Sequence, residues 1–162
     1  MCLTTLHTRL RSLRRDERGA VLVEFALVLP LLLILLLGMV DFGKAYNYWI
    51  DGTHLSATGA RWAVVNNNPG PGATLQQSIR DQADSGELRN GGTGSMPNPA
   101  TVCITFPKGT SNVGDPVKVT VTADYNFLNF IGVKTGVTAA SITGSSTMRL
   151  EQVPTNYSAG CS

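Results

Sequence analysis

The dominant pattern along the chain is a long apolar run near the N-terminus. The run extends from Ala20 to Val40, and Glu24 is its one charged residue. As a helix it would span about 30 Å, which matches the hydrocarbon core of a bilayer. A helix packed in a small soluble domain normally keeps a polar face, and this run has none. We therefore predict a transmembrane helix over residues 20–40.

The helical pattern continues beyond the apolar run and becomes amphipathic. Small residues recur every four positions at Gly52, Ser56 and Ala60. Residues four apart share a helix face, and small ones allow another helix or a sheet to approach closely. A loop-forming segment, residues 66–72, then ends the helix. The sequence thus predicts a second, amphipathic part of the same helix that packs by its small-residue face.

Three aromatic residues, Tyr46, Tyr48 and Trp49, follow the apolar run. Amphipathic rings are favoured at the interface between membrane and water, so these positions suit the outer surface of the bilayer. For all three we expect a structural role in packing rather than contact with a ligand.

A short surface helix is predicted over residues 74–88. Leu75, Ile79 and Ala83 recur at helical spacing and form its thin apolar side. Three acidic residues are expected on its solvated face rather than in a catalytic or calcium site: Asp81, Asp84 and Glu87. Residues 90–99 are rich in Gly, Asn and Pro and predict a loop.

Alternation of apolar and polar residues predicts three strands after this loop. The first covers residues 101–106, and the second, the clearest, covers residues 117–125. In the third, residues 142–150, one face carries Ile142, Ser146, Met148 and Leu150. An apolar loop, residues 127–131, is expected to close the sheet edge, and contact with a partner or with lipid is the alternative. The fold class is α+β, with a long N-terminal helix packed on a small antiparallel sheet.

The charges flanking the apolar run predict its orientation. Few charged residues follow the run directly. Five arginines precede it: Arg9, Arg11, Arg14, Arg15 and Arg18. By the positive-inside rule, residues 1–19 are a basic cytoplasmic leader and residues 41–162 are an exported domain. A cleaved signal peptide is the alternative, but its apolar core would be shorter, about 7–15 residues. We therefore expect a single-pass protein that keeps its membrane helix.

The net charge of +2 comes from this leader and not from the exported part. A nucleic-acid-binding protein needs a basic patch on its folded surface to displace phosphate counterions. The sequence after Gly19 offers no such patch, so a nucleic-acid partner is not expected.

Glu24 is the unusual residue of the apolar run. A carboxylate within a membrane helix is costly unless it reaches water or finds a partner, so it suggests a functional role. The alternative is that its side chain extends to the nearby cytoplasmic interface. That alternative explains why the residue is tolerated, but not its spacing from Gly19.

The segment around Gly19 resembles a prepilin-peptidase processing site of the Flp/Tad type. In such sites cleavage follows a glycine, and the fifth residue of the mature chain is a glutamate followed by an aromatic residue. Gly19, Glu24 and Phe25 occupy those places here. The resemblance to the TadE-like family extends across roughly residues 17–65. The pseudopilins of type II secretion are a poorer match, because their mature chains usually begin Phe-Thr-Leu-Ile-Glu.

The resemblance implies a minor pilin or pseudopilin-like subunit that takes part in assembly of an adhesive Flp-type (Tad) pilus. A prepilin peptidase would cut after Gly19 and free an ammonium group on Ala20. Glu24 would then face a neighbouring subunit's N-terminus or assist extraction from the membrane. The implied partners are this peptidase, other Tad pilus subunits, the assembly platform and the lipid of the bacterial inner membrane. The implied fold is pilin-like.

Two cysteines, Cys103 and Cys161, lie in the predicted exported domain, whereas Cys2 lies in the leader. In an oxidising compartment the first two can form a disulfide, because Cys103 is on the polar face of its strand and the C-terminal tail can reach it. Two unrelated free thiols are the alternative.

Nothing in the sequence indicates an enzyme. His7 lies in the leader, so His54 is the one histidine outside it, and no multi-histidine metal site is available. The sequence contains no phosphate-binding loop, nucleophile elbow or dinucleotide fingerprint. We expect neither catalysis nor a cofactor. The main alternative to a pilus subunit is an unprocessed, membrane-anchored domain that binds a partner outside the cell.

Overall fold

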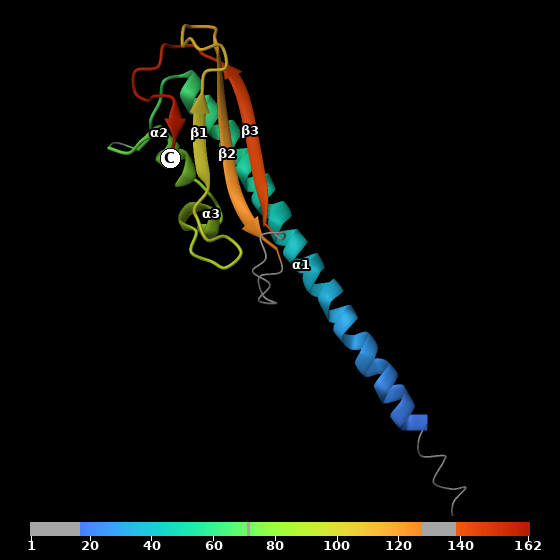
Figure 1. Ribbon diagram of the computed structural model, residues 1–162. Helices are drawn as coiled ribbons and strands as arrows, with labels where there is room; N and C mark the ends of the chain where they lie inside the picture. Colours follow the sequence, from blue (N-terminus) through green and yellow to red (C-terminus); the bar gives the residue numbers. More distant parts are fainter. Residues whose placement is uncertain (1–16, 71, 128–138) are drawn as a thin grey trace, which may run out of the picture. The chain divides into compact units, whose positions relative to one another are not determined.

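The computed structural model describes residues 17–70, 72–127 and 139–162 (Figure 1). It contains helices α1 (Glu17–Val64), α2 (Leu75–Arg80) and α3 (Gly86–Asn90), followed by strands β1 (Thr101–Thr105), β2 (Pro116–Asn126), β3 (Ala139–Arg149) and β4 (Gly160–Cys161). The strands form one sheet in the order β3-β2-β1-β4, and every neighbouring pair is antiparallel. The predicted α+β class, with a long N-terminal helix packed on a small antiparallel sheet, is confirmed.

The described chain divides between Val40 and Asp41 into two units. The first consists of the N-terminal part of α1. The second contains the rest of α1, both short helices and the sheet. A single helix therefore belongs to both units, and its two parts have different surroundings.

In the second unit, α1 covers one face of the sheet (Figure 1). Its buried side carries small and apolar residues: Ala45, Gly52, Leu55, Ser56, Gly59, Ala60 and Ala63. The sheet contributes the alternate residues of β1 and β2: Val102, Ile104, Val117, Val119, Val121, Ala123 and Tyr125. The period of four on the helix and the period of two on the strands thus bring one face of each element into a common core.

Glycines allow the elements around α1 to approach closely. A Cβ on Gly144 of β3 would lie 2.6 Å from the backbone carbon of Gly52 and 2.6 Å from the backbone nitrogen of Thr53. A Cβ on Gly59 would lie 2.5 Å from the side chain of Ile79 in α2. The prediction of close packing along the small-residue stripe is therefore correct, and β3 contributes a glycine of its own to it.

The prediction of one helix over residues 74–88 is wrong, because a turn separates α2 from α3. Gln82 and Ala83 donate backbone hydrogen bonds to the carbonyls three residues earlier, at 3.1 and 3.0 Å, which tightens the chain after α2. Ser85 then donates from its backbone N–H to the Asp51 carboxylate of α1 at 3.2 Å. The apolar side was placed correctly, since Leu75, Ile79 and Ala83 are all buried.

The three predicted strands are present with the predicted faces. In β2 the buried positions alternate as expected, and in β3 Ile142, Ser146 and Met148 share the inward side with Gly144. The short strand β4 was not predicted as a strand. Of the predicted apolar loop, Phe127 packs edge-on against Tyr125 with ring centroids 4.8 Å apart. The rest of that loop, residues 128–131, lies outside the described residues.

Candidate functional site

The predicted processing site lies within α1, close to the point where the described residues start. The bond between Gly19 and Ala20 is helical, and both residues are exposed. A Cβ on Gly19 would meet no atom within 4 Å.

Glu24 and Phe25 follow on the same exposed helix. Phe25 is 60% exposed, and Glu24 makes no ion pair or hydrogen bond with any other described residue. Ala20 and Glu24 are four residues apart, so they lie on one face of the helix, one turn from each other. A free amine on Ala20 would therefore lie on the same side of the helix as the Glu24 carboxylate.

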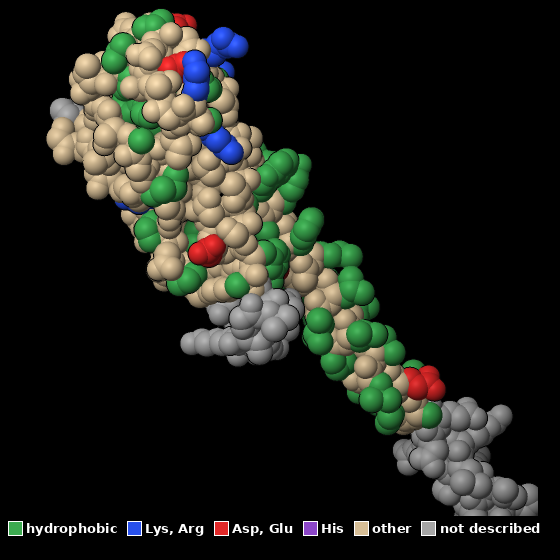
Figure 2. Space-filling model, turned by 45° about the horizontal axis from the view of Figure 1, so that its top comes forward, with side chains coloured by type: hydrophobic (Ala, Val, Ile, Leu, Met, Phe, Trp, Pro, Cys, Tyr) green, Lys and Arg blue, Asp and Glu red, His purple; other side chains and the backbone are tan. Residues whose placement is uncertain are grey.

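Hydrophobic side chains surround this part of α1 on every side. The apolar residues of its surface are exposed throughout, from Val21 at 63% to Val40 at 55% (Figure 2). Among the described residues this is the one helix long and apolar enough to cross a membrane. It continues without a break through Pro30, although a proline removes one backbone donor. This surface suits an apolar environment and not water.

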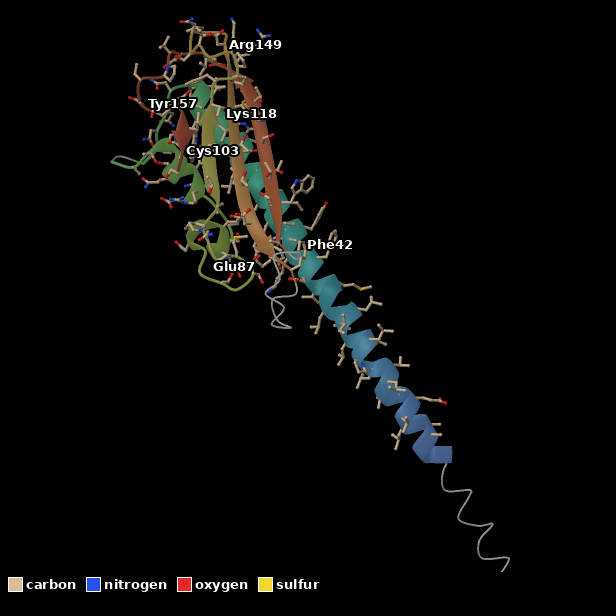
Figure 3. The ribbon with its side chains drawn as sticks, in the orientation of Figure 1. Phe42, Glu87, Cys103, Lys118, Arg149 and Tyr157 are labelled. Carbon is tan, nitrogen blue, oxygen red and sulfur yellow. A yellow bond between two sulfur atoms is a disulfide. The ribbon has the colours of Figure 1, made fainter. Side chains whose placement is uncertain are left out.

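The second unit carries a buried polar cluster that sequence reasoning missed. The hydroxyl of Tyr125 in β2 donates a hydrogen bond to the Asp41 carboxylate. The hydroxyl of Tyr48 donates one to Glu87 of α3, which is labelled in Figure 3. The two tyrosine rings are 5.6 Å apart. Burial, together with the neighbouring carboxylates, raises the pKa of both tyrosines above the usual value. Both hydroxyls therefore stay neutral and act as donors.

Two expectations about these residues need correction. Tyr48 is buried at 4% exposure, so it packs inside the domain, unlike Tyr46 and Trp49, which are exposed. Glu87 is half-buried and hydrogen-bonded to Tyr48, whereas Asp81 and Asp84 are exposed as expected. No local signal could reveal these pairs, because the hydrogen bonds join residues 84 and 39 positions apart.

Asp51 is the other buried acid of α1. Its Oδ2 accepts hydrogen bonds from the backbone N–H and the hydroxyl of Ser85, at 3.2 and 3.3 Å. Its Oδ1 has no hydrogen-bond partner among the described residues. The contact ties the segment between α2 and α3 to α1, which is a structural role.

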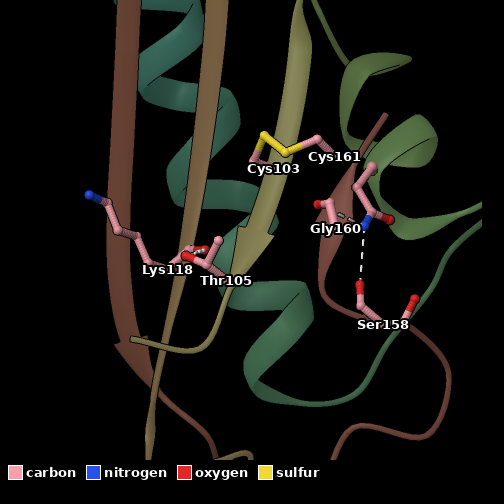
Figure 4. Close-up of a disulfide and its surroundings, with 7 residues drawn as sticks. Cys103, Thr105, Lys118, Ser158, Gly160 and Cys161 are labelled. Carbon is pink, nitrogen blue, oxygen red and sulfur yellow. Dashed lines mark hydrogen bonds between the residues drawn. A yellow bond between two sulfur atoms is a disulfide. The ribbon is translucent and has the colours of Figure 1, made fainter. Parts of the chain in front are cut away.

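Cys103 and Cys161 form a disulfide between β1 and β4, with their Cα atoms 4.0 Å apart (Figure 4). They are directly opposite each other in the antiparallel pairing of these strands. Cys161 is exposed and Cys103 is half-buried. The bond therefore lies on the outer face of the sheet, away from α1.

Two cavities of the second unit are formed by described residues that include no charged side chain. One, of about 640 Å³, lies between residues 72–77 and the C-terminal tail. The other, of about 460 Å³, lies between residues 42–49 of α1 and residues 141–143 of β3. Neither is lined by a histidine, an acidic residue or a basic residue. Within the described ranges, histidines, cysteines and acids form no group of three that would hold a metal ion.

Comparison with protein families identifies one match. The TadE-like protein family model matches residues 19–61, which begin at the predicted processing site and end near the end of α1. The predicted resemblance to the TadE-like family is confirmed over this segment. Members of this family are pilus assembly components, and the family is not a known enzyme family. The match therefore supports, in general terms, a role associated with the Tad pilus. Comparisons with curated proteins and with solved structures give no significant match.

Proposed function

We propose that this protein is a minor pilin-like subunit that takes part in assembly of a Flp-type Tad pilus and is cut after Gly19 by a prepilin peptidase. One observation carries the proposal. The segment that matches the TadE-like family begins with an apolar stretch, residues 20–40, whose hydrophobic side chains are exposed, and a carboxylate without a partner among the described residues lies near its start. Such a helix needs both an apolar environment and a cationic partner for Glu24.

Cutting after Gly19 would supply that partner. It creates an ammonium group on Ala20, one helical turn from Glu24 and on the same face. In a filament the same ammonium group on one subunit can meet Glu24 of the next. Pairing offsets part of the cost of holding each charge in an apolar place. The carboxylate also lies near the N-terminus of the shortened helix, where the helix dipole favours negative charge.

Cutting would also release the subunit from the cytoplasmic leaflet. The leader carries five arginines, and basic residues beside a membrane helix bind the anionic inner surface and fix orientation. Once these are removed, the helix keeps its apolar surface and a single acidic group. The subunit would then leave the bilayer more easily and join other pilus subunits at the assembly platform.

The proposed location is the bacterial inner membrane, crossed once, with residues 1–19 in the cytoplasm and residues 41–162 exported. The disulfide between Cys103 and Cys161 supports export of the second unit, because disulfides persist in oxidising compartments. The partners we propose are the prepilin peptidase, other Tad pilus or pseudopilin subunits, the assembly platform and lipid.

The intact mass of the protein extracted from membranes of its native host tests the processing step. We expect a chain that begins at Ala20. In the same host, Gly19→Leu should block the cut, because a bulky side chain hinders entry of the helix start into a protease. Gly43→Leu is the matched control, since Gly43 is also an exposed glycine of α1 with no atom within 4 Å of a Cβ. An uncut wild-type chain would refute processing.

Glu24 is tested separately from the cut. Glu24→Gln keeps the size of the side chain and removes its charge, so we expect cutting to continue while the protein no longer supports pilus assembly. Glu24→Asp keeps the charge and should retain part of the function. If Glu24→Gln supports assembly as well as the wild type, the carboxylate has no role in assembly. An uncut protein that remains in the membrane would instead favour an anchored, exported binding domain.

A further inference from the structure

The C-terminal tail, residues 150–162, is held to the rest of the domain at two separate places. It starts beside the end of α1, where Glu151 and Gln152 donate backbone hydrogen bonds to the carbonyl of Val64 at 3.1 and 3.2 Å. It ends as β4 on the outer edge of the sheet, beside β1 (Figure 1). The two places differ in the kind of contact that holds the tail.

The first place is a cluster of hydrogen bonds around Asn66. The Asn66 side-chain oxygen accepts hydrogen bonds from the backbone N–H groups of Thr155 and Asn156, each at 2.9 Å. Its nitrogen donates to the Thr155 hydroxyl at 2.8 Å. Asn66 has a φ of 54°, a left-handed conformation that asparagine tolerates better than most residues. This part of the tail is fixed without help from the disulfide.

The second place is held by hydrogen bonds and by the disulfide rather than by buried apolar side chains. Residues 158–162 are all exposed, so they bury little apolar surface. Val102 and Ser162 exchange two backbone hydrogen bonds, at 2.9 and 3.0 Å. The Gln76 side chain donates to the carbonyls of Ser158 and Gly160, at 3.1 and 3.3 Å (Figure 4). The Gln76 side chain is itself buried, but each of these hydrogen bonds contributes only about 1 kcal/mol of net stability.

The covalent bond at this second place is accessible to reagents in solution. Cys161 is exposed on the surface of the domain. The sulfur of Cys161 can therefore be attacked without unfolding of the sheet. Exposed disulfides are the ones that exchange readily.

We propose that the disulfide between Cys103 and Cys161 is a redox latch, which holds residues 158–162 as the edge strand of the sheet and releases them when it is reduced. The consequence concerns β1. Its five residues, Thr101–Thr105, carry no charged side chain. Without β4, the outer backbone groups of β1 would be unpaired, and such an edge can pair with a strand of another chain. The latch closes this edge only in an oxidising compartment.

The closing step is an exchange with a disulfide-bearing oxidant, such as a thiol–disulfide oxidoreductase or oxidised glutathione. The Cys161 thiolate attacks one sulfur of the oxidant and displaces the other as a thiolate. The Cys103 thiolate then attacks the Cys161 sulfur and displaces the oxidant's remaining sulfur as a second thiolate. The two cysteines lose two electrons and two protons, and the oxidant takes up both and becomes two thiols. A dithiol reverses the reaction.

Amide hydrogen exchange measured by NMR on the full-length chain in detergent micelles tests the latch. A Cys2→Ser background prevents pairing with the third cysteine. We compare the oxidised protein, the same folded protein after addition of a dithiol, and the Cys103→Ser/Cys161→Ser variant. In both forms without the disulfide, exchange at Val102 and Ser162 should become at least about tenfold faster, as expected for local opening. Exchange at Thr155, Asn156 and Val119 should stay unchanged.

Asn66→Ala in the oxidised protein is the matched control. It should expose the amides of Thr155 and Asn156 while Val102 and Ser162 stay protected by the disulfide. Two results would overturn the latch. In one, Val102 and Ser162 keep their protection after reduction, so the non-covalent contacts are sufficient. In the other, Val119 in the centre of the sheet loses protection as well, so the bond stabilises the whole domain rather than its edge.

Discussion

The two parts of α1 show how one helix can be built for two environments. Over residues 20–40 the helix is apolar on every side, and its side chains are exposed in the structure. Over residues 41–64 it has a buried side, with Leu55 and Ser56 at 1% and 0% exposure, and an exposed side that carries polar residues such as Asn47 and His54 beside Trp49 and Ile50. Among the described residues, the more hydrophobic part is thus the one whose apolar side chains are exposed.

This difference follows from what each part must contact. Exposure of so many apolar side chains to water would cost on the order of tens of kcal/mol at 25 cal/mol per Å². Lipid or the helices of other subunits remove that cost without any particular pattern of residues. Packing against a sheet instead requires small residues at fixed spacing, because backbones must approach closely. Hydrophobicity therefore predicts the first part, and residue size predicts the second.

Truncating one leucine in each part gives the largest expected difference. Leu55→Ala should lower the free energy of unfolding of the domain by about 3 kcal/mol, because it leaves a cavity in the core. Leu35→Ala, at a position that is 56% exposed, should change it by less than about 0.5 kcal/mol. Denaturant titration in micelles, followed by the fluorescence of Trp62, measures both. Equal effects at the two positions would contradict the division of α1.

Adding one methyl group to β3 tests the close contact with the second part of α1. Gly144→Ala should destabilise the domain by about 2 kcal/mol, because the new Cβ overlaps the helix backbone at Gly52. Ser145→Ala is the control, since Ser145 is exposed on the same strand. The same titration applies. A stability equal to that of the control would mean that β3 does not approach α1 so closely.

Removing one hydroxyl group tests the buried polar cluster at the start of the second part. Tyr125→Phe should lower the free energy of unfolding by about 1.5 kcal/mol, because Asp41 loses a buried donor. Tyr46→Phe, at a position that is 54% exposed, should have little effect.

The raised pKa of Tyr125 adds a pH dependence to that comparison. The unfolded chain releases the tyrosine proton near pH 10, whereas the folded domain retains it. The unfolded state then binds fewer protons, so wild-type stability should fall as the pH rises above 10. Tyr125→Phe should show a smaller fall. An unchanged slope would show that this hydroxyl is not held neutral by the fold.

The smallest effect is expected at Asp115, far along the chain from α1. Its hydrogen bonds with Lys108 and Thr110 lower its pKa to about 2. The unfolded chain takes up a proton near pH 4, so the stabilisation is present above that pH and is lost as the pH falls toward 2. Asp115→Asn should reduce the fall in stability over this range. The Lys108→Met variant, which removes the ion pair at 2.8 Å, should act in the same direction.

Local patterns in the sequence predicted much of the fold. The apolar run, the small-residue stripe and the alternation in β2 each depend on neighbours within a few residues, so their elements and buried faces were predicted correctly. The helix predicted over residues 74–88 was wrong because Asp51, more than 30 residues earlier, binds Ser85 and stabilises the turn. Strand β4 was missed because two residues cannot show an alternation.

The candidate functional residues also divide into those that a local sequence pattern predicts and those that it does not. Gly19, Glu24 and Phe25 form a linear motif, so a single sequence is sufficient to propose them. The polar cluster of Asp41, Tyr48, Glu87 and Tyr125 depends on contacts between distant elements. Its residues belong to types that are usually exposed, and only the packing of α1 on α3 and the sheet brings them together.

Site-directed spin labelling of α1 in lipid bilayers tests the central claim most directly. Labels would be placed one at a time over residues 27–36 and over residues 44–61, and their access to oxygen and to a water-soluble nickel chelate would be measured. We predict high oxygen access and low nickel access at every position of the first segment. In the second, nickel access should vary with helical period and be highest near Asn47, His54 and Arg61. A nickel-accessible face that repeats along residues 27–36 would contradict the account.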